Sequence, residues 1–165
     1  MRNAAAALFA AVAFVSCFGQ DPNVTPAGKG RPDLTLNFPE TSTPGSTRAA
    51  RLTVANPGPE PMTTVVVAFL RVGPAQGGGL PEPIVDGAAK QQNPAIVDIE
   101  PEPRAVSQAA VEFTFDGLAE GESTTITFRL KVPRALGEAA NSITVYDGSD
   151  ANRARGIRLQ TIVEP

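Results

Sequence analysis

The sequence predicts an all-β fold, an antiparallel β-sandwich of seven to nine strands. Its 15 glycines and 16 prolines make up nearly a fifth of the 165 residues and recur as turn signals along the chain. Between these turns lie short segments in which apolar and polar residues alternate, and no segment keeps a helical period over three turns. Short alternating strands joined by turns are typical of two sheets that bury their inner faces against each other.

The N-terminal half of the predicted domain contains three strand signals. Leu34, Leu36 and Phe38 alternate with polar residues, and so do Ala50, Leu52 and Val54. Residues 62–72 are nearly continuously apolar, which predicts a central strand with both faces covered. A long irregular segment, Gly73–Pro94, follows and contains one short strand signal at Ile84-Val85.

The C-terminal half repeats this pattern. Asp116-Gly117 predicts the start of a loop that runs to Gly121, and Asp147-Gly148-Ser149-Asp150 predicts the turn of a last hairpin. Alternation is clearest around Phe128, which it places on the inner face between Ile126 and Leu130. The predicted strands cover residues 96–99, 111–115, 125–132 and the two arms of a hairpin over 143–163.

The first nineteen residues have the features of an export signal. Arg2 precedes an uncharged apolar run, residues 4–15, that is too short to span a bilayer. The sequence therefore predicts a signal peptide over residues 1–19, a flexible tether over 20–32 and the sandwich over 33–165. It also predicts an extracytoplasmic location, which is secreted, periplasmic or lipid-anchored to the envelope.

Two cleavage sites are compatible with this signal. Phe14-Val15-Ser16-Cys17 resembles the lipobox of bacterial lipoproteins, in which cleavage precedes a cysteine that is then lipidated. Cleavage after Gly19 by an ordinary signal peptidase is the alternative. In both cases the folded domain lacks cysteine, because Cys17 is the only one in the chain.

Charge and composition argue against several function classes. The net charge of −3 is spread along the chain without blocks, which argues against nucleic acid and against a polybasic membrane patch. Contact with a membrane is expected only through a lipid on Cys17. The absence of histidine removes the commonest general base and the commonest transition-metal ligand.

The positions of the acidic residues and of Lys131 are explained by turns and exposed strand faces without a catalytic or metal-binding role. The pairs Glu100/Glu102 and Glu120/Glu122 lie in predicted turns, where solvated carboxylates are common. Asp147 and Asp150 supply two carboxylates for Ca²⁺, but Asp and Gly are also ordinary hairpin-turn residues. Strand alternation places Lys131 outward. We therefore predict no catalytic, cofactor-binding or metal-binding residues, and no enzymatic activity.

The long loop is the best candidate for recognition. Gly73–Pro94 exceeds the usual length of a connection, and loops at the end of a rigid sandwich often carry binding. The candidate residues are Gln76, Gly77, Gly78, Gly79 and Leu80. The alternative, favoured by the run of three glycines, is a disordered insertion.

Three segments resemble a bacterial surface repeat, the family called domain of unknown function eleven. These are RLTVANPGP at 51–59, GLAEGESTTIT at 117–127 and NSITV at 141–145 with Asp150 and Asn152 after it. The family's usual Leu-Pro-Ala-Gly turn is replaced here by Leu70-Arg71-Val72-Gly73-Pro74. The resemblance implies an immunoglobulin-like sandwich in a cell-envelope protein, and it implies no catalytic residue.

Together these observations predict an exported, non-enzymatic, immunoglobulin-like module of the bacterial envelope. Its expected role is protein binding, adhesion or structural assembly, with an envelope or surface protein as partner. The alternative is a small carbohydrate-binding sandwich with a glycan as partner. Against it stands the composition, because such sites stack sugars on aromatic rings and this chain has no Trp and a single Tyr.

Overall fold

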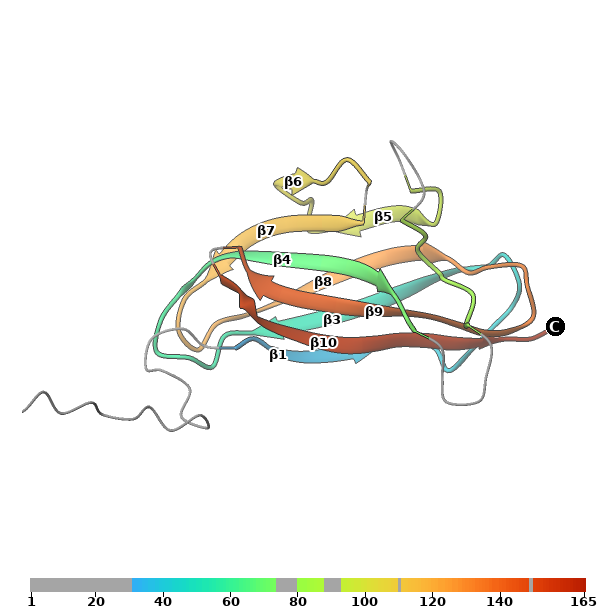
Figure 1. Ribbon diagram of the computed structural model, residues 1–165, viewed down its shortest axis with the longest axis horizontal. Coiled ribbons are helices and arrows are strands. Elements are labelled where there is room, and N and C mark those ends of the chain that lie inside the picture. The colour runs from blue at the N-terminus through green and yellow to red at the C-terminus, as the bar shows by residue number, and fades with distance from the viewer. Residues whose placement is uncertain (1–30, 74–79, 88–92, 110, 149) are drawn as a thin grey trace, which may run out of the picture.

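A computed structural model describes residues 31–73, 80–87, 93–109, 111–148 and 150–165. Cys17, the rest of the predicted signal and most of the predicted tether lie outside these ranges. The described chain forms two β-sheets, one of four strands and one of six, which lie against each other (Figure 1). Across these ranges, no helix has the length and apolar character needed to cross a membrane.

The four-stranded sheet is antiparallel throughout and has the order β1-β3-β8-β5. Its strands are β1 (Asp33–Asn37), β3 (Thr47–Ala55), β8 (Ser123–Lys131) and β5 (Ile96–Glu100). Leu36 lies opposite Leu52, which in turn lies opposite Ile126, so the predicted inner residues of three strands fall in one row. Val97 is 55% exposed because the register of β5 shifts between Ile96 and Asp98.

The six-stranded sheet has the order β2-β10-β9-β4-β7-β6. Its strands are β2 (Thr41–Ser42), β10 (Asp150–Val163), β9 (Gly137–Asp147), β4 (Met62–Arg71), β7 (Glu112–Leu118) and β6 (Ala105–Val106). The pairing of β10 with β2 is parallel, whereas the other pairings in this sheet are antiparallel. The ten strands exceed the predicted seven to nine because β2 and β6 have only two residues each, too few for an alternating pattern.

The core lies between the two sheets and joins them. Phe128 of β8 has no exposed surface and contacts three phenylalanines of the opposite sheet. Its ring centroid lies 5.0 Å from that of Phe69, 5.7 Å from that of Phe113 and 6.4 Å from that of Phe115. A single buried cluster therefore holds both sheets together, as the alternation predicted.

The strand order is that of an immunoglobulin-like sandwich. A sheet of β10, β9, β4 and β7 faces a sheet of β1, β3, β8 and β5, and the central strand β4 is buried on both faces from Val65 to Phe69. The chain departs from the usual immunoglobulin order at one point: β5, which pairs with β8, precedes β7 in the sequence. The fold class predicted from the sequence is confirmed.

Two local predictions differ from the structure. Ile84-Val85 is not a strand; the only bridge in this described segment is an isolated one between Glu82 and Ala139. The predicted loop from Asp116 to Gly121 is shorter, because β7 continues through Gly117 to Leu118.

Candidate functional site

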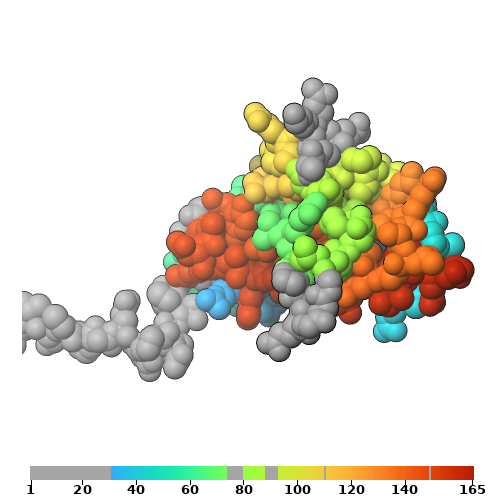
Figure 2. Space-filling model, turned by 45° about the vertical axis from the view of Figure 1, so that its right-hand side comes forward, coloured from blue at the N-terminus to red at the C-terminus, as the bar shows by residue number. Residues whose placement is uncertain are grey.

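The described part of the long loop is attached to the six-stranded sheet. We call residues 80–87 the strap. Figure 2 shows them in light green on the surface of the molecule. The amide of Glu82 donates to the carbonyl of Glu138 (3.1 Å), and the amide of Ala140 donates to the carbonyl of Glu82 (2.9 Å). The strap thus lies beside β9 where β4, which ends at Arg71, no longer does.

Asn141 of β9 holds the strap through its side-chain amide. Oδ1 accepts a hydrogen bond from the backbone amide of Val85 (2.9 Å), and Nδ2 donates to the carbonyl of the same residue (2.9 Å). Nδ2 also donates to the carbonyl of Leu70 (3.2 Å). Asn141 has no exposed surface, so these bonds satisfy an amide that burial would otherwise penalise.

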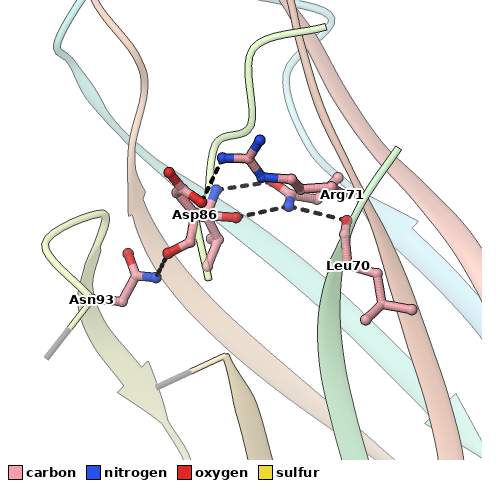
Figure 3. Close-up of polar contacts among 6 residues, drawn as sticks. Leu70, Arg71, Asp86 and Asn93 are labelled. Carbon is pink, nitrogen blue, oxygen red and sulfur yellow. Dashed lines mark hydrogen bonds and ion pairs between the residues drawn. The ribbon is translucent and has the colours of Figure 1, made fainter. Parts of the chain in front are cut away.

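A second set of contacts lies on the outer side of the strap. Arg71 donates to the carboxylate of Asp86 (2.8 Å), and Asn93 Nδ2 donates to the carbonyl of Asp86 (2.8 Å; Figure 3). The hydrogen bond and the charge of Asp86 both raise the pKa of Arg71 above its ordinary value. The side chains of Arg71 and Asp86 are 63% and 47% exposed, so this ion pair contributes little to stability and mainly orients the strap.

Two apolar residues anchor the strap in the core. Ile84 is 3% exposed and Val85 is 1% exposed, and both belong to the same cluster as Phe128. Burying a side chain of this size stabilises a fold by about 1.5–3 kcal/mol. The strap is therefore an integral part of the sandwich and not a detached loop.

A hollow of about 680 Å³ lies between the strap and the end of β8; we call it the end hollow. Apolar residues line much of it, namely Pro83, Ile84, Pro94, Ala95, Val132, Pro133 and Ala135. Charged side chains of both signs border it: Glu82 and Asp86 on the strap side, Lys131 and Arg134 on the β8 side. Neither Lys131 nor Arg134 forms an ion pair with another described residue.

The structure places one of the five predicted recognition residues. Leu80 begins the strap and is 66% exposed, whereas Gln76, Gly77, Gly78 and Gly79 lie outside the described residues. Cys17 lies outside them as well. The sequence prediction missed Asn141 and Asn93, which fix the strap. Its one available signal was a polar residue, Asn141, among the apolar inward positions of β9.

Two of the carboxylates that the sequence offered for chemistry, Asp147 and Glu122, serve structural contacts. Asp147 Oδ1 accepts hydrogen bonds from Thr63 Oγ1 (2.6 Å) and from the amides of Thr63 (3.2 Å) and Thr64 (3.4 Å). Glu122 accepts from the amide of Ala119 (2.8 Å) and closes a turn. In the portion of the chain that is described, no three His, Cys, Asp or Glu residues gather in a way that would hold a metal ion.

Tyr146 is the one titratable aromatic group, and it lies on the outer face of the six-stranded sheet. Partial burial raises the pKa of its hydroxyl, and the charge of Glu112 and a hydrogen bond to it raise this pKa further.

Comparison with known proteins gives structural likeness only. No protein-family model and no curated protein matches the chain. Among solved structures, the chain is similar to an ASH/PapD-like domain of human CEP192, with 15% identity, a TM-score of 0.43, and coverage of 87% of this chain and 90% of that one. It is also similar to the human F-spondin reeler domain, with 15% identity, a TM-score of 0.43, and coverage of 82% and 96%.

Proposed function

We propose that this protein is an exported, non-enzymatic module of the bacterial cell envelope that binds another protein through its end hollow. The signal-like residues 1–19 and the resemblance to a bacterial surface repeat support the location. The end hollow supports the binding role, because it combines an apolar lining with Lys131 and Arg134, which form no ion pair with another described residue.

The observation that carries the proposal is the way in which Asn141 fixes the strap. A loop that is already ordered loses little conformational freedom when a partner binds, so more of the contact energy appears as affinity. The three hydrogen bonds of Asn141 and the burial of Ile84 and Val85 provide this order. Lys131 is the last residue of β8, and Arg134 follows it in the connection to β9.

Site-specific photo-crosslinking in the producing bacterium tests the proposal. A crosslinking amino acid is placed in the full chain at Ala135, which borders the end hollow, and as a control at Thr125, on the exposed face of the four-stranded sheet. We expect one envelope protein to crosslink from position 135 and not from 125. We also expect Lys131→Glu together with Arg134→Glu to reduce this product by about tenfold.

Two outcomes would overturn the proposal. The first is equal crosslinking from both positions. The second is no protein crosslink at all together with a signal on a glycan array, which would favour the carbohydrate-binding alternative.

A further inference from the structure

We propose that the free edge of β10 accepts an extended, alternately apolar peptide strand from a partner protein. This inference rests on the proposed protein-binding function, but it names a different surface from the end hollow. Three features of the described residues carry it: an unpaired strand edge, incompletely covered apolar residues beside that edge, and other edges that are blunted, covered or shorter.

The first feature is the pairing of β10. On one side β9 pairs with it over the whole segment from Arg155 to Val163. On the other side β2 pairs with it only at Ile162 and Val163, and no other described strand takes its place. The amide of Ile162 donates to the carbonyl of Glu40 (2.8 Å), and that of Glu164 donates to the carbonyl of Ser42 (3.1 Å).

Backbone groups of a strand point to alternate sides. The backbone amides of Ile162 and Glu164 point toward β2. Every second residue before them therefore has its backbone groups on the same side of β10, in line with β2; these residues are Gly156, Arg158 and Gln160. The short strand β2 thus marks the position that a longer added strand would occupy.

The second feature is a seam between β10 and β1. Two hollows lie along it, one of about 340 Å³ that Leu36 and Phe38 help to line, and one of about 220 Å³ that Leu34 and Ile157 help to line. These four apolar residues of the seam pack against the core and are only half-buried. The residues opposite Leu36 and Leu34 on β3, Leu52 and Val54, have no exposed surface.

The core is therefore less completely covered along this seam than along its central strands. Alternate side chains of a strand added beside β10 would lie over the seam and remove more of this apolar surface from water.

The third feature is the state of the other edges. β5 is interrupted by its register shift and carries the charged residues Asp98 and Glu100. Irregular pairing and charged side chains are typical features that keep an edge strand from pairing with a further strand. The edge of β7 is covered by β6, reinforced by hydrogen bonds from Arg104 to Thr114 (2.7 Å) and from Ser107 to Glu112 (2.9 Å). The remaining edge strand, β1, has only five residues, whereas β10 runs without a break from Arg155 to Val163, so among the described strands β10 offers the longest uninterrupted edge.

Charge disfavours a second copy of this chain as the occupant. In antiparallel self-pairing, outward-pointing residues of the two copies must lie opposite each other, and the register centred on Arg158 would place Arg158 of one copy directly opposite Arg158 of the other. Like charges directly opposite each other destabilise a strand pair. The occupant that fits is a strand of a different protein, with apolar residues at alternate positions facing the seam.

A displayed peptide library tests this inference on the full chain. The library has peptides of about seven residues, the length of the free edge, with Val, Ile, Leu or Phe at alternate positions and random residues between them. We expect binders whose affinity falls about tenfold in Gln160→Pro, because proline removes the outward amide and leaves the pairing with β9 in place. Gln160→Ala keeps that amide and is the matched control, with affinity expected to stay within about twofold.

A second measurement leaves the protein unchanged, in case Gln160→Pro does not fold. The selected peptide is N-methylated on one alternate set of its amides and, separately, on the other set. We expect one set to abolish binding and the other to be tolerated, because only one edge of the peptide pairs with β10.

A library without binders overturns the inference, and so do binders that tolerate both methylation patterns. Binders that tolerate Gln160→Pro but are lost in Lys131→Glu with Arg134→Glu would also overturn it, while supporting the end hollow. Failure of the proposed function is seen separately, in the crosslinking from position 135.

Discussion

The side chain of Asn141 forms with Val85 the pair of hydrogen bonds that two residues of neighbouring strands normally exchange. Its Oδ1 accepts the amide of Val85 and its Nδ2 donates to the carbonyl of Val85, both at 2.9 Å. The side-chain amide of Asn141 thus takes the place of a neighbouring strand's backbone. It does so where β4 ends and β9 has no further strand on that side. Asn141 thereby fixes the strap at Val85.

Asn141→Ala is expected to lower the free energy of unfolding by about 3 kcal/mol, because it removes the partners of the buried amide and carbonyl of Val85 and one partner of the part-buried carbonyl of Leu70. Urea unfolding measures the loss. Asn37→Ala on the exposed face of β1 is the control and is expected to change stability by less than about 0.5 kcal/mol. Equal losses in the two variants would show that the contacts of Asn141 do not hold the strap.

Alternation predicted the inner faces because burial acts on every second residue of a strand. Leu52, Phe128 and Leu130 lie inward with no exposed surface, as their spacing required. The continuous apolar run at 62–72 likewise predicted a central strand, and β4 lies between β9 and β7. These features depend only on neighbours in sequence, which a single chain displays.

The strap could not be predicted, because its contacts join residues far apart in the chain. Asn141 and Val85 are separated by 56 residues, and nothing in their local sequence indicates the pairing. Asp116-Gly117 has the composition of a turn, but tertiary packing keeps it in β7. Glycine is needed there for close backbone approach and not for a bend.

Gly117→Ala is expected to destabilise the fold by about 3 kcal/mol or more. A Cβ atom at this position would lie 2.2 Å from the carbonyl oxygen of Met62 and 2.6 Å from that of Thr63, so the backbone of β4 would have to move. Thermal unfolding measures the effect. Gly73→Ala is the matched control, since a Cβ there meets no atom within 4 Å and should change stability by less than about 0.5 kcal/mol. Similar melting temperatures for the two variants would contradict the close packing of β7 on β4.

Phe128→Asp is expected to abolish folding. The ring lies between the two sheets with no exposed surface, and a carboxylate there would be buried among phenylalanines without a partner. Circular dichroism and the dispersion of amide signals in NMR measure the outcome. Arg129→Asp, one residue further along and on the exposed face, should leave a cooperative unfolding transition. A transition for Phe128→Asp like that of the unsubstituted protein would refute the inward position of this ring.

Tyr146 should titrate above the ordinary tyrosine pKa of about 10, because partial burial and the neighbouring Glu112 both favour its neutral form. The only tyrosine in a chain without tryptophan can be followed directly by the near-ultraviolet absorbance of tyrosinate. A pKa raised by folding contributes stability that is complete below the unfolded pKa and is lost as the pH rises through the folded value.

Glu112→Gln should lower the pKa of Tyr146 only in part, because burial, the larger cause, remains. Glu102→Gln, an exposed substitution outside this contact, should leave the titration unchanged. A midpoint that Glu112→Gln does not move would exclude the Glu112 contact. A midpoint equal to that of the unfolded chain would exclude the burial of this face of β9.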